Sequence, residues 1–186
     1  MKIVSTNIAK PTTIEWDGQK VETGIYKYAV EIPIFLGIED VVDDHVIDRR
    51  YHGGADKACY LYSADHYPFW QNKYPKLDWQ WGMFGENLTV SGLDESQIRI
   101  GDRFQLGTAV VQVTQPRQPC FKLGVRFGDQ SVVTDFWSSP YPGVYVRVLV
   151  PGEVKTGDQL ILMESNPESF SVSQVFLMIR QNNGGV

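Results

Sequence analysis

The chain has few cysteines: only Cys59 and Cys120 occur among its 186 residues. Two thiols exclude a disulfide framework, and they cannot bind an iron–sulfur cluster, which requires about four thiolates. They suit a reducing compartment, so we expect the protein to be cytoplasmic. Any electrons that it uses must then come from another molecule.

Long hydrophobic runs and an excess of positive charge are also absent. The longest apolar run, Ile32–Ile38, contains Pro33 and Gly37 and is far shorter than the roughly 20 residues of a membrane helix. The first residues lack the apolar region of a signal peptide. The net charge is -5 and the pI is about 5.2, which is a poor match to the phosphates of nucleic acids. We therefore expect no membrane and no nucleic acid among its partners.

Several catalytic and metal-binding motifs are missing. There is no glycine-rich phosphate loop followed by Lys-Ser/Thr and no Gly-x-Ser-x-Gly nucleophile motif. His52, Cys59 and His66 are spaced by seven residues, which differs from the short paired spacing of structural zinc ligands. Hydrolase and nucleotide-binding interpretations therefore have no support in the sequence.

Glycine and proline interrupt short runs of β-branched and aromatic residues along most of the chain. Residues 108–115 and 143–150 alternate between two faces, the period-two pattern of strands. Gly101-Asp102 and Gly157-Asp158 predict two equivalent turns, each of which leads into a strand. Short strands at this density predict an α+β, mostly β fold with a closed or strongly curved sheet.

Helical signals are few. Ser63 can cap a helix that contains Trp70 and ends before Pro75. Residues 171–180 place apolar side chains at helical spacing and predict a short C-terminal helix. We therefore expect one β-rich domain over residues 1–165 and a short helical tail over residues 166–186.

Residues 49–57 form the first of three segments whose side chains could bind a ligand or take part in a reaction. Arg49, His52 and Lys57 flank Gly53-Gly54, a pair whose backbone can approach a ligand or adopt positive φ. Cations and donors of this kind suit an anionic or phosphate-bearing ligand. A glycine turn with solvated charges is the alternative.

Residues 85–88 form the second segment. Glu86 and Asn87 interrupt an apolar context, and such a carboxylate and amide, if buried, require specific hydrogen-bond partners. An exposed turn ahead of a strand is the alternative.

Residues 115–122 form the third segment, in which two prolines stiffen the chain around Arg117. Cys120 lies near Arg117 and Lys122 in sequence, and neighbouring cations favour the thiolate, the form that binds metals and attacks electrophiles. A small buried hydrophobe is the alternative for a lone cysteine. We expect the other cysteine, Cys59, to lie in the core, because it belongs to an apolar strand-like run.

Taken in order, these motifs resemble a MOSC domain, the C-terminal module of molybdenum cofactor sulfurases. The resemblance extends over about residues 20–165 and is strongest to the stand-alone bacterial branch linked to 6-hydroxylaminopurine resistance. Each motif is weak alone, whereas their combination is specific. The motifs and residues that carry it are Thr23-Gly24-Ile25, Lys27, Asp44, His52-Gly53-Gly54, Asp56-Lys57-Ala58, Tyr62, Gly85-Glu86-Asn87-Leu88, Gly101-Asp102, Pro116-Arg117-Gln118-Pro119-Cys120, Gly143–Arg147 and Gly157-Asp158.

The resemblance implies a twisted MOSC-type β-barrel that binds the molybdenum cofactor (molybdopterin). It also implies that Cys120 is the protein ligand to molybdenum, a metal for which thiolate is a suitable soft ligand. The implied activity is the reduction of N-hydroxylated bases or related N-oxygenated compounds, with electrons from an external redox partner. Pyridoxal phosphate is carried only as an inherited family label, because no lysine stands out as a Schiff-base site.

The resemblance also suggests site residues. The catalytic set is Cys120, His52 and Arg117. Glu86 and Asn87 are expected to orient these residues by hydrogen bonds. An alternative from another class is a sulfur carrier or cofactor-binding module, in which Cys120 holds a persulfide whose anion Arg117 stabilises. Both functions use the same cysteine, so the sequence does not separate them. The full cofactor-binding set is Arg49, His52, Gly53, Gly54, Lys57, Glu86, Asn87, Arg117 and Cys120.

Overall fold

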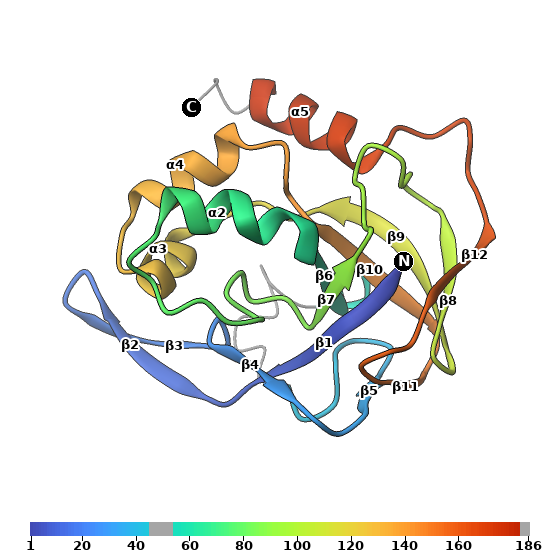
Figure 1. Cartoon of the computed structure of the whole chain (residues 1–186), viewed down its shortest axis with the longest axis horizontal. Coiled ribbons are helices and arrows are strands. Elements are labelled where there is room, and N and C mark those ends of the chain that lie inside the picture. The colour runs from blue at the N-terminus through green and yellow to red at the C-terminus, as the bar shows by residue number, and fades with distance from the viewer. Residues whose placement is uncertain (45–53, 183–186) are drawn as a thin grey trace.

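The computed structural model describes residues 1–44 and 54–182 of the chain. An eight-stranded sheet forms the frame, in the order β12-β8-β9-β10-β6-β7-β1-β4 (Figure 1). Neighbouring strands are antiparallel except β6 and β7, which are parallel. The strands are β1 (Lys2–Ala9), β4 (Lys27–Val30), β6 (Cys59–Ser63), β7 (Leu88–Ser91), β8 (Arg103–Leu106), β9 (Ala109–Pro116), β10 (Val144–Val150) and β12 (Leu160–Glu164).

Two small ribbons accompany the main sheet. One pairs β5 (Ile34–Leu36) with β11 (Gly152–Val154). The other is a hairpin of β2 (Thr12–Trp16) and β3 (Gln19–Thr23), which projects from the sheet in Figure 1. Its Trp16 ring stacks on Phe121 with centroids 4.8 Å apart. The hairpin therefore covers the start of the helix that follows Cys120.

The helices lie together on one side of the sheet (Figure 1). They are α2 (Tyr67–Lys73), α3 (Phe121–Phe127), α4 (Ser131–Ser138) and α5 (Val172–Asn182), with the short 3-10 turns η1 (Ala55–Lys57) and η2 (Ala64–His66). Within the described ranges, no helix is long and apolar enough to cross a membrane. The mostly β architecture with few helices is confirmed.

The sequence predicts a closed or strongly curved sheet, and the closed barrel is wrong, because the sheet formed by residues 1–44 and 54–182 curls without closing. Its two edges are β12 and β4. The turn before β12 reaches β1, where Ile3 N–H donates to the Asp158 carbonyl at 2.8 Å and Leu160 N–H donates to the Met1 carbonyl at 3.1 Å. Beyond this contact β12 pairs with β8, and the far half of β1 pairs with β4. The hydrogen bonds between β1 and the start of β12 therefore extend over only a few residues.

The two Gly-Asp turns predicted from the sequence are confirmed. Gly101 and Gly157 adopt φ of 93° and 97°, which is left-handed backbone that favours glycine. Asp102 and Asp158 each accept a hydrogen bond at 2.9 Å from a backbone N–H three residues earlier. One turn leads into β8 and the other into β12, and these two strands pair with each other.

Two of the helices were not predicted. The helix after Ser63 is confirmed as η2 and α2, and the C-terminal helix is confirmed as α5. The missed helices, α3 and α4, have seven and eight residues, and neither has a side-chain hydrogen bond at its N-cap. Short helices without capping side chains give little signal in a sequence.

Both faces of β6 are buried, which explains its continuous apolar sequence. Cys59 and Leu61 face an aliphatic cluster formed by the strands. Tyr60 and Tyr62 face an aromatic cluster formed with the helices. Cys59 is 0% exposed, so its predicted core position is confirmed. Strand β6 therefore joins the sheet core to the helical layer.

Helix α5 contributes to both clusters. Val172 belongs to the aliphatic cluster, and Phe176 belongs to the aromatic one. The Phe176 ring stacks on Trp137 with centroids 5.2 Å apart. Residues after 165 thus pack into the same core as the rest of the chain, and the boundary near residue 165 stays a prediction.

We predict that Phe176→Ala destabilises the protein by about 3–5 kcal/mol, because it leaves a cavity in the aromatic cluster. The neighbouring side chain of Leu177 is 42% exposed, so Leu177→Ala serves as the matched control and should cost less than about 1 kcal/mol. Urea unfolding followed by circular dichroism measures both. Equal losses of stability in the two variants would show that burial of Phe176 does not contribute more to the packing of α5 than the exposed Leu177 does.

Candidate functional site

Cys120 lies between a strand and a helix. Strand β9 ends at Pro116, and α3 begins at Phe121 with Cys120 as its N-cap residue. The Cys120 side chain is half-buried, in contrast to the fully buried Cys59. Burial raises the pKa of the Cys59 thiol well above its usual range, which keeps that thiol protonated. The two cysteines therefore occupy different environments, as the sequence predicts.

Arg117 is buried beside this loop and lies on aromatic rings. It is 5% exposed, and its guanidinium carbon lies 5.3 Å from the ring centroids of both Tyr60 and Phe136. In the described part of the chain, its Nη1 atom is buried without a hydrogen-bond partner. A buried donor without a partner requires an explanation, and a bound anion is one that suits a guanidinium.

Tyr145 connects the predicted site residues to one another. Burial raises the pKa of its phenol, the Arg117 guanidinium opposes that shift, and Cys120 adds to it. The Lys57 ammonium lies 5.9 Å from the Tyr145 ring centroid, and the Tyr60 ring lies 5.0 Å from it. The structure thus brings Lys57, Arg117 and Cys120 around a tyrosine that lies in the Gly143–Arg147 motif but was given no role in the sequence analysis. Its alternation with buried valines placed it on the opposite face of β10 but gave no sign of function.

The position of Lys57 is fixed by contacts of η1 with two strands. Asp56 forms an ion pair with Arg147 at 2.5 Å, and its carbonyl accepts a hydrogen bond from the Thr114 hydroxyl at 2.6 Å. Gly54 precedes η1 with φ of 91°, the positive value that the sequence analysis anticipated for the glycine pair. Arg49, His52 and Gly53 lie outside the described residues, so their roles stay predictions.

Glu86 is fully buried and saturated with hydrogen bonds, so the alternative of an exposed turn is wrong. Its carboxylate accepts hydrogen bonds from the Tyr67 hydroxyl at 2.5 Å and the Thr89 hydroxyl at 2.9 Å. It also accepts from the backbone N–H groups of Gly82 at 2.9 Å and Phe84 at 3.1 Å. Burial raises the pKa of the Glu86 carboxyl, and these hydrogen bonds oppose that rise.

Asn87 ties the start of β6 to a buried ion pair. Its amide oxygen accepts a hydrogen bond from Tyr60 N–H at 3.2 Å, and its amide nitrogen donates to Asp44 at 2.8 Å. Asp44 forms an ion pair with Lys27, and both side chains are buried. Asn87 therefore fixes the backbone of Tyr60, whose ring lies beside the Arg117 guanidinium. A direct contact of Glu86 or Asn87 with a cofactor stays a prediction.

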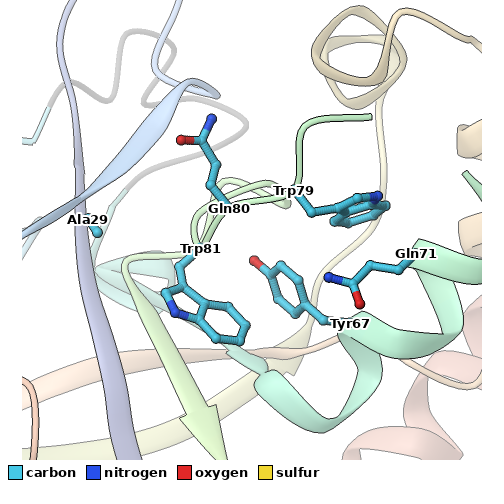
Figure 2. Close-up of a pocket in the computed structure, with 6 residues that line it drawn as sticks. All are labelled: Ala29, Tyr67, Gln71, Trp79, Gln80 and Trp81. Atoms are coloured by element: carbon cyan, nitrogen blue, oxygen red, sulfur yellow. The ribbon is translucent and has the colours of Figure 1, made fainter. Parts of the chain in front are cut away.

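A separate depression of about 370 Å³ lies near the far end of α3. Figure 2 shows the rings of Tyr67, Trp79 and Trp81 grouped at it. Trp79 contacts Phe127, the last residue of α3, with ring centroids 5.6 Å apart. A helix of this length spans roughly 10 Å, so the depression and Cys120 lie at opposite ends of α3. Its lining residues are Ala29, Tyr67, Gln71, Trp79, Gln80 and Trp81.

Comparison with known proteins identifies relatives that cover most of the chain. Residues 48–161 match the family model of the MOSC domain. The YflK protein of Bacillus subtilis is 44% identical over 170 residues, which cover 91% of this chain and 76% of that protein. The YiiM protein of Escherichia coli is 35% identical over 130 residues, or 69% of this chain and 57% of that protein. A protein of Gibberella moniliformis named "Reductase" is 33% identical over 169 residues, but the match spans 30% of its length.

Solved structures share the fold. YiiM from Geobacillus stearothermophilus has a TM-score of 0.81 and 32% identity, over 98% of this chain and 85% of that chain. YiiM from Escherichia coli has a TM-score of 0.70 and 25% identity, over 96% and 77% of the two chains. The curled sheet with helices on one side is therefore shared with these proteins.

We predict that Glu86→Gln destabilises the protein by about 1–3 kcal/mol at low pH, because an amide nitrogen then faces a backbone donor. The pKa of Glu86 is raised in the folded state, so its contribution to stability is complete at low pH and declines as the pH rises through the folded-state pKa. The stability difference between wild type and variant should narrow as the pH rises from about 4, the ordinary range of a glutamate, through the raised pKa of Glu86. Urea unfolding at several pH values measures this. A difference that widens with pH would contradict the raised pKa.

Proposed function

This chain belongs to the MOSC domain family, and from that premise we propose that it is an oxidoreductase that binds the molybdenum cofactor. We assign it N-hydroxylated bases or related N-oxygenated compounds as substrates. The observation that carries the proposal is the half-buried Cys120 beside Arg117, whose buried Nη1 lacks a partner in the described residues. The name of the Gibberella relative agrees with a reductase.

The described residues fit the cofactor chemically. Cys120 offers a soft thiolate ligand, and Arg117 and Lys57 offer positive charge to the phosphate of a pterin. Among residues 1–44 and 54–182, no group of three or more His, Cys, Asp or Glu side chains could hold a metal ion. The cofactor itself would supply further ligands to the metal. When bound, the cofactor would supply two-electron redox chemistry at molybdenum.

The side chains around Cys120 divide the remaining tasks. Arg117, held between Tyr60 and Phe136, binds and orients an anionic oxygen. Tyr145 stays protonated because burial raises its pKa, so its hydroxyl holds a proton near the thiol. Reduction of an N–OH group to N–H consumes two electrons and two protons and releases water. We assign the electrons to an external redox partner and the reaction to the cytoplasm.

Metal analysis of protein from cells that make the molybdenum cofactor is the decisive experiment. About one molybdenum per chain supports the oxidoreductase. The rival function is a sulfur carrier, which the electrostatic interaction between Cys120 and Arg117 favours, because a guanidinium also stabilises a persulfide anion. Cyanide-labile sulfur without molybdenum would support the carrier and overturn the proposal.

We predict that Cys120→Ser lowers reductase activity toward an N-hydroxylated base to background, because a serine oxygen is a poor replacement for a soft thiolate. Its stability should change by about 1 kcal/mol or less, since the side chain is half-buried. Cys59→Ser is the matched control and should keep activity while losing about 1–3 kcal/mol of stability. Full activity of Cys120→Ser with a supplied redox partner would remove Cys120 as the metal ligand.

A further inference from the structure

Glu95 is a buried carboxylate that holds a turn distant from it in sequence. It is 2% exposed, and its Oε1 accepts a hydrogen bond from Gly143 N–H at 3.0 Å. Its Oε2 lies 2.8 Å from His66 Nε2. The His66 ring stacks on Tyr141 with centroids 3.9 Å apart. Glu95 and His66 therefore fix both ends of the turn formed by residues 141–143.

This turn presses against Tyr60. The Tyr60 hydroxyl donates to the Pro142 carbonyl at 2.9 Å. Gly143 has φ of 67°, and a Cβ at that position would lie 2.6 Å from the Tyr60 hydroxyl oxygen and 2.7 Å from the Leu61 carbonyl. The close approach leaves no room for the turn to shift without moving Tyr60.

Tyr60 and Tyr145 pass this constraint to the site. The Tyr60 ring is one of the two aromatic faces beside the Arg117 guanidinium. Tyr145 follows Gly143 by two residues in β10 and is coupled electrostatically to Arg117 and Cys120. Burial raises the pKa of Tyr60, Arg117 opposes that rise, and Glu95 adds to it. Both phenols next to Arg117 thus depend on the turn that Glu95 holds.

We infer that Glu95 is a positioning residue for the Cys120–Arg117 site. With His66 it fixes the turn of residues 141–143, and through Tyr60 and Tyr145 it fixes the guanidinium beside the thiol. A neutral apolar residue at position 95 would leave Gly143 N–H buried without an acceptor. The inference rests on the proposed function for the use of this site, but the contacts that carry it do not involve a cofactor.

The alkylation rate of Cys120 by iodoacetamide tests the inference on the full chain purified without cofactor. Cys59 is fully buried, so alkylation of the folded protein reports on Cys120. Arg117→Ala should change the alkylation rate about tenfold, because access to a half-buried thiol depends on the buried side chain beside it. Glu95→Ala should change the rate about threefold in the same direction, because the guanidinium loses its fixed position. Glu95→Gln retains an acceptor for Gly143 N–H and should stay within about twofold of wild type.

Two controls separate positioning from stability. Asp102 is also buried and accepts hydrogen bonds from Arg99 N–H at 2.9 Å and Asn166 N–H at 2.8 Å, far from the turn in sequence. Asp102→Ala should lose stability and keep the wild-type alkylation rate. His66→Phe keeps a ring against Tyr141 and removes the hydrogen bond to Glu95, so its rate should lie between those of wild type and Glu95→Ala.

A wild-type alkylation rate in Glu95→Ala, with a stability loss like that of Asp102→Ala, would overturn the inference and leave Glu95 a structural residue. If Glu95→Ala does not fold, an unchanged rate in His66→Phe overturns it instead. Absence of molybdenum from the wild-type protein would overturn the proposed function alone, because the alkylation test does not depend on metal.

Discussion

The burial of Glu86 and Asn87 at the start of the parallel β6–β7 pair is the constraint on which the rest of the site depends. Glu86 takes four donors from α2, β7 and the loop between them. Burying a carboxylate costs several kcal/mol unless such donors offset the loss of water. Asn87 adds a bond to Tyr60 N–H and one to Asp44. Together they fix where β6 begins, and therefore where Tyr60 faces the helical layer.

Position along β6 determines which chemistry each residue faces. Cys59 faces the aliphatic side, where burial raises its thiol pKa and leaves it inert. Tyr60, one residue on, faces the aromatic side and lies beside Arg117. Because side chains alternate along a strand, a shift of one residue would exchange these two surroundings. The polar pair that sets the register of β6 is thus a condition for the arrangement around Cys120.

The sequence predicts the strands and turns well because their signals are local. The alternation of residues 143–150, the two Gly-Asp turns and the cap at Ser63 each depend on a few neighbouring residues. Barrel closure is different, because it depends on how many residues of β1 and β12 pair with each other, and these strands are far apart in the sequence. The short helices α3 and α4 are held by packing of Leu123, Phe127 and Phe136 into the aromatic cluster, which no short pattern encodes.

The same distinction applies to the site. Motif order predicts Lys57, Arg117 and Cys120 as a group, and the structure places all three near Tyr145. Tyr145 was part of a motif but was given no role, and Glu95 was missed, because each acts through contacts with residues far away in the chain. Tyr145 differs from other strand tyrosines only in its neighbours, and Glu95 resembles a surface carboxylate until its burial is known. The roles of Tyr145 and Glu95 therefore become visible only in the tertiary structure.

Burial distinguishes Arg117 from the other arginines in the described ranges. Arg126 also lies on two aromatic rings and has buried nitrogen atoms without a partner among the described residues, but its side chain is only half-buried. Lys27, Arg147, Arg103 and Lys73 each lie within ion-pair distance of a carboxylate. Arg117 is more buried than the arginines among them, yet aromatic faces take the place of a carboxylate partner among residues 1–44 and 54–182. A buried cation without an anion costs several kcal/mol, and protein folds retain such costs mainly at functional sites. The charge of Arg117 interacts with Tyr60, Tyr145 and Cys120, and an anionic ligand bound beside these residues would offset that cost.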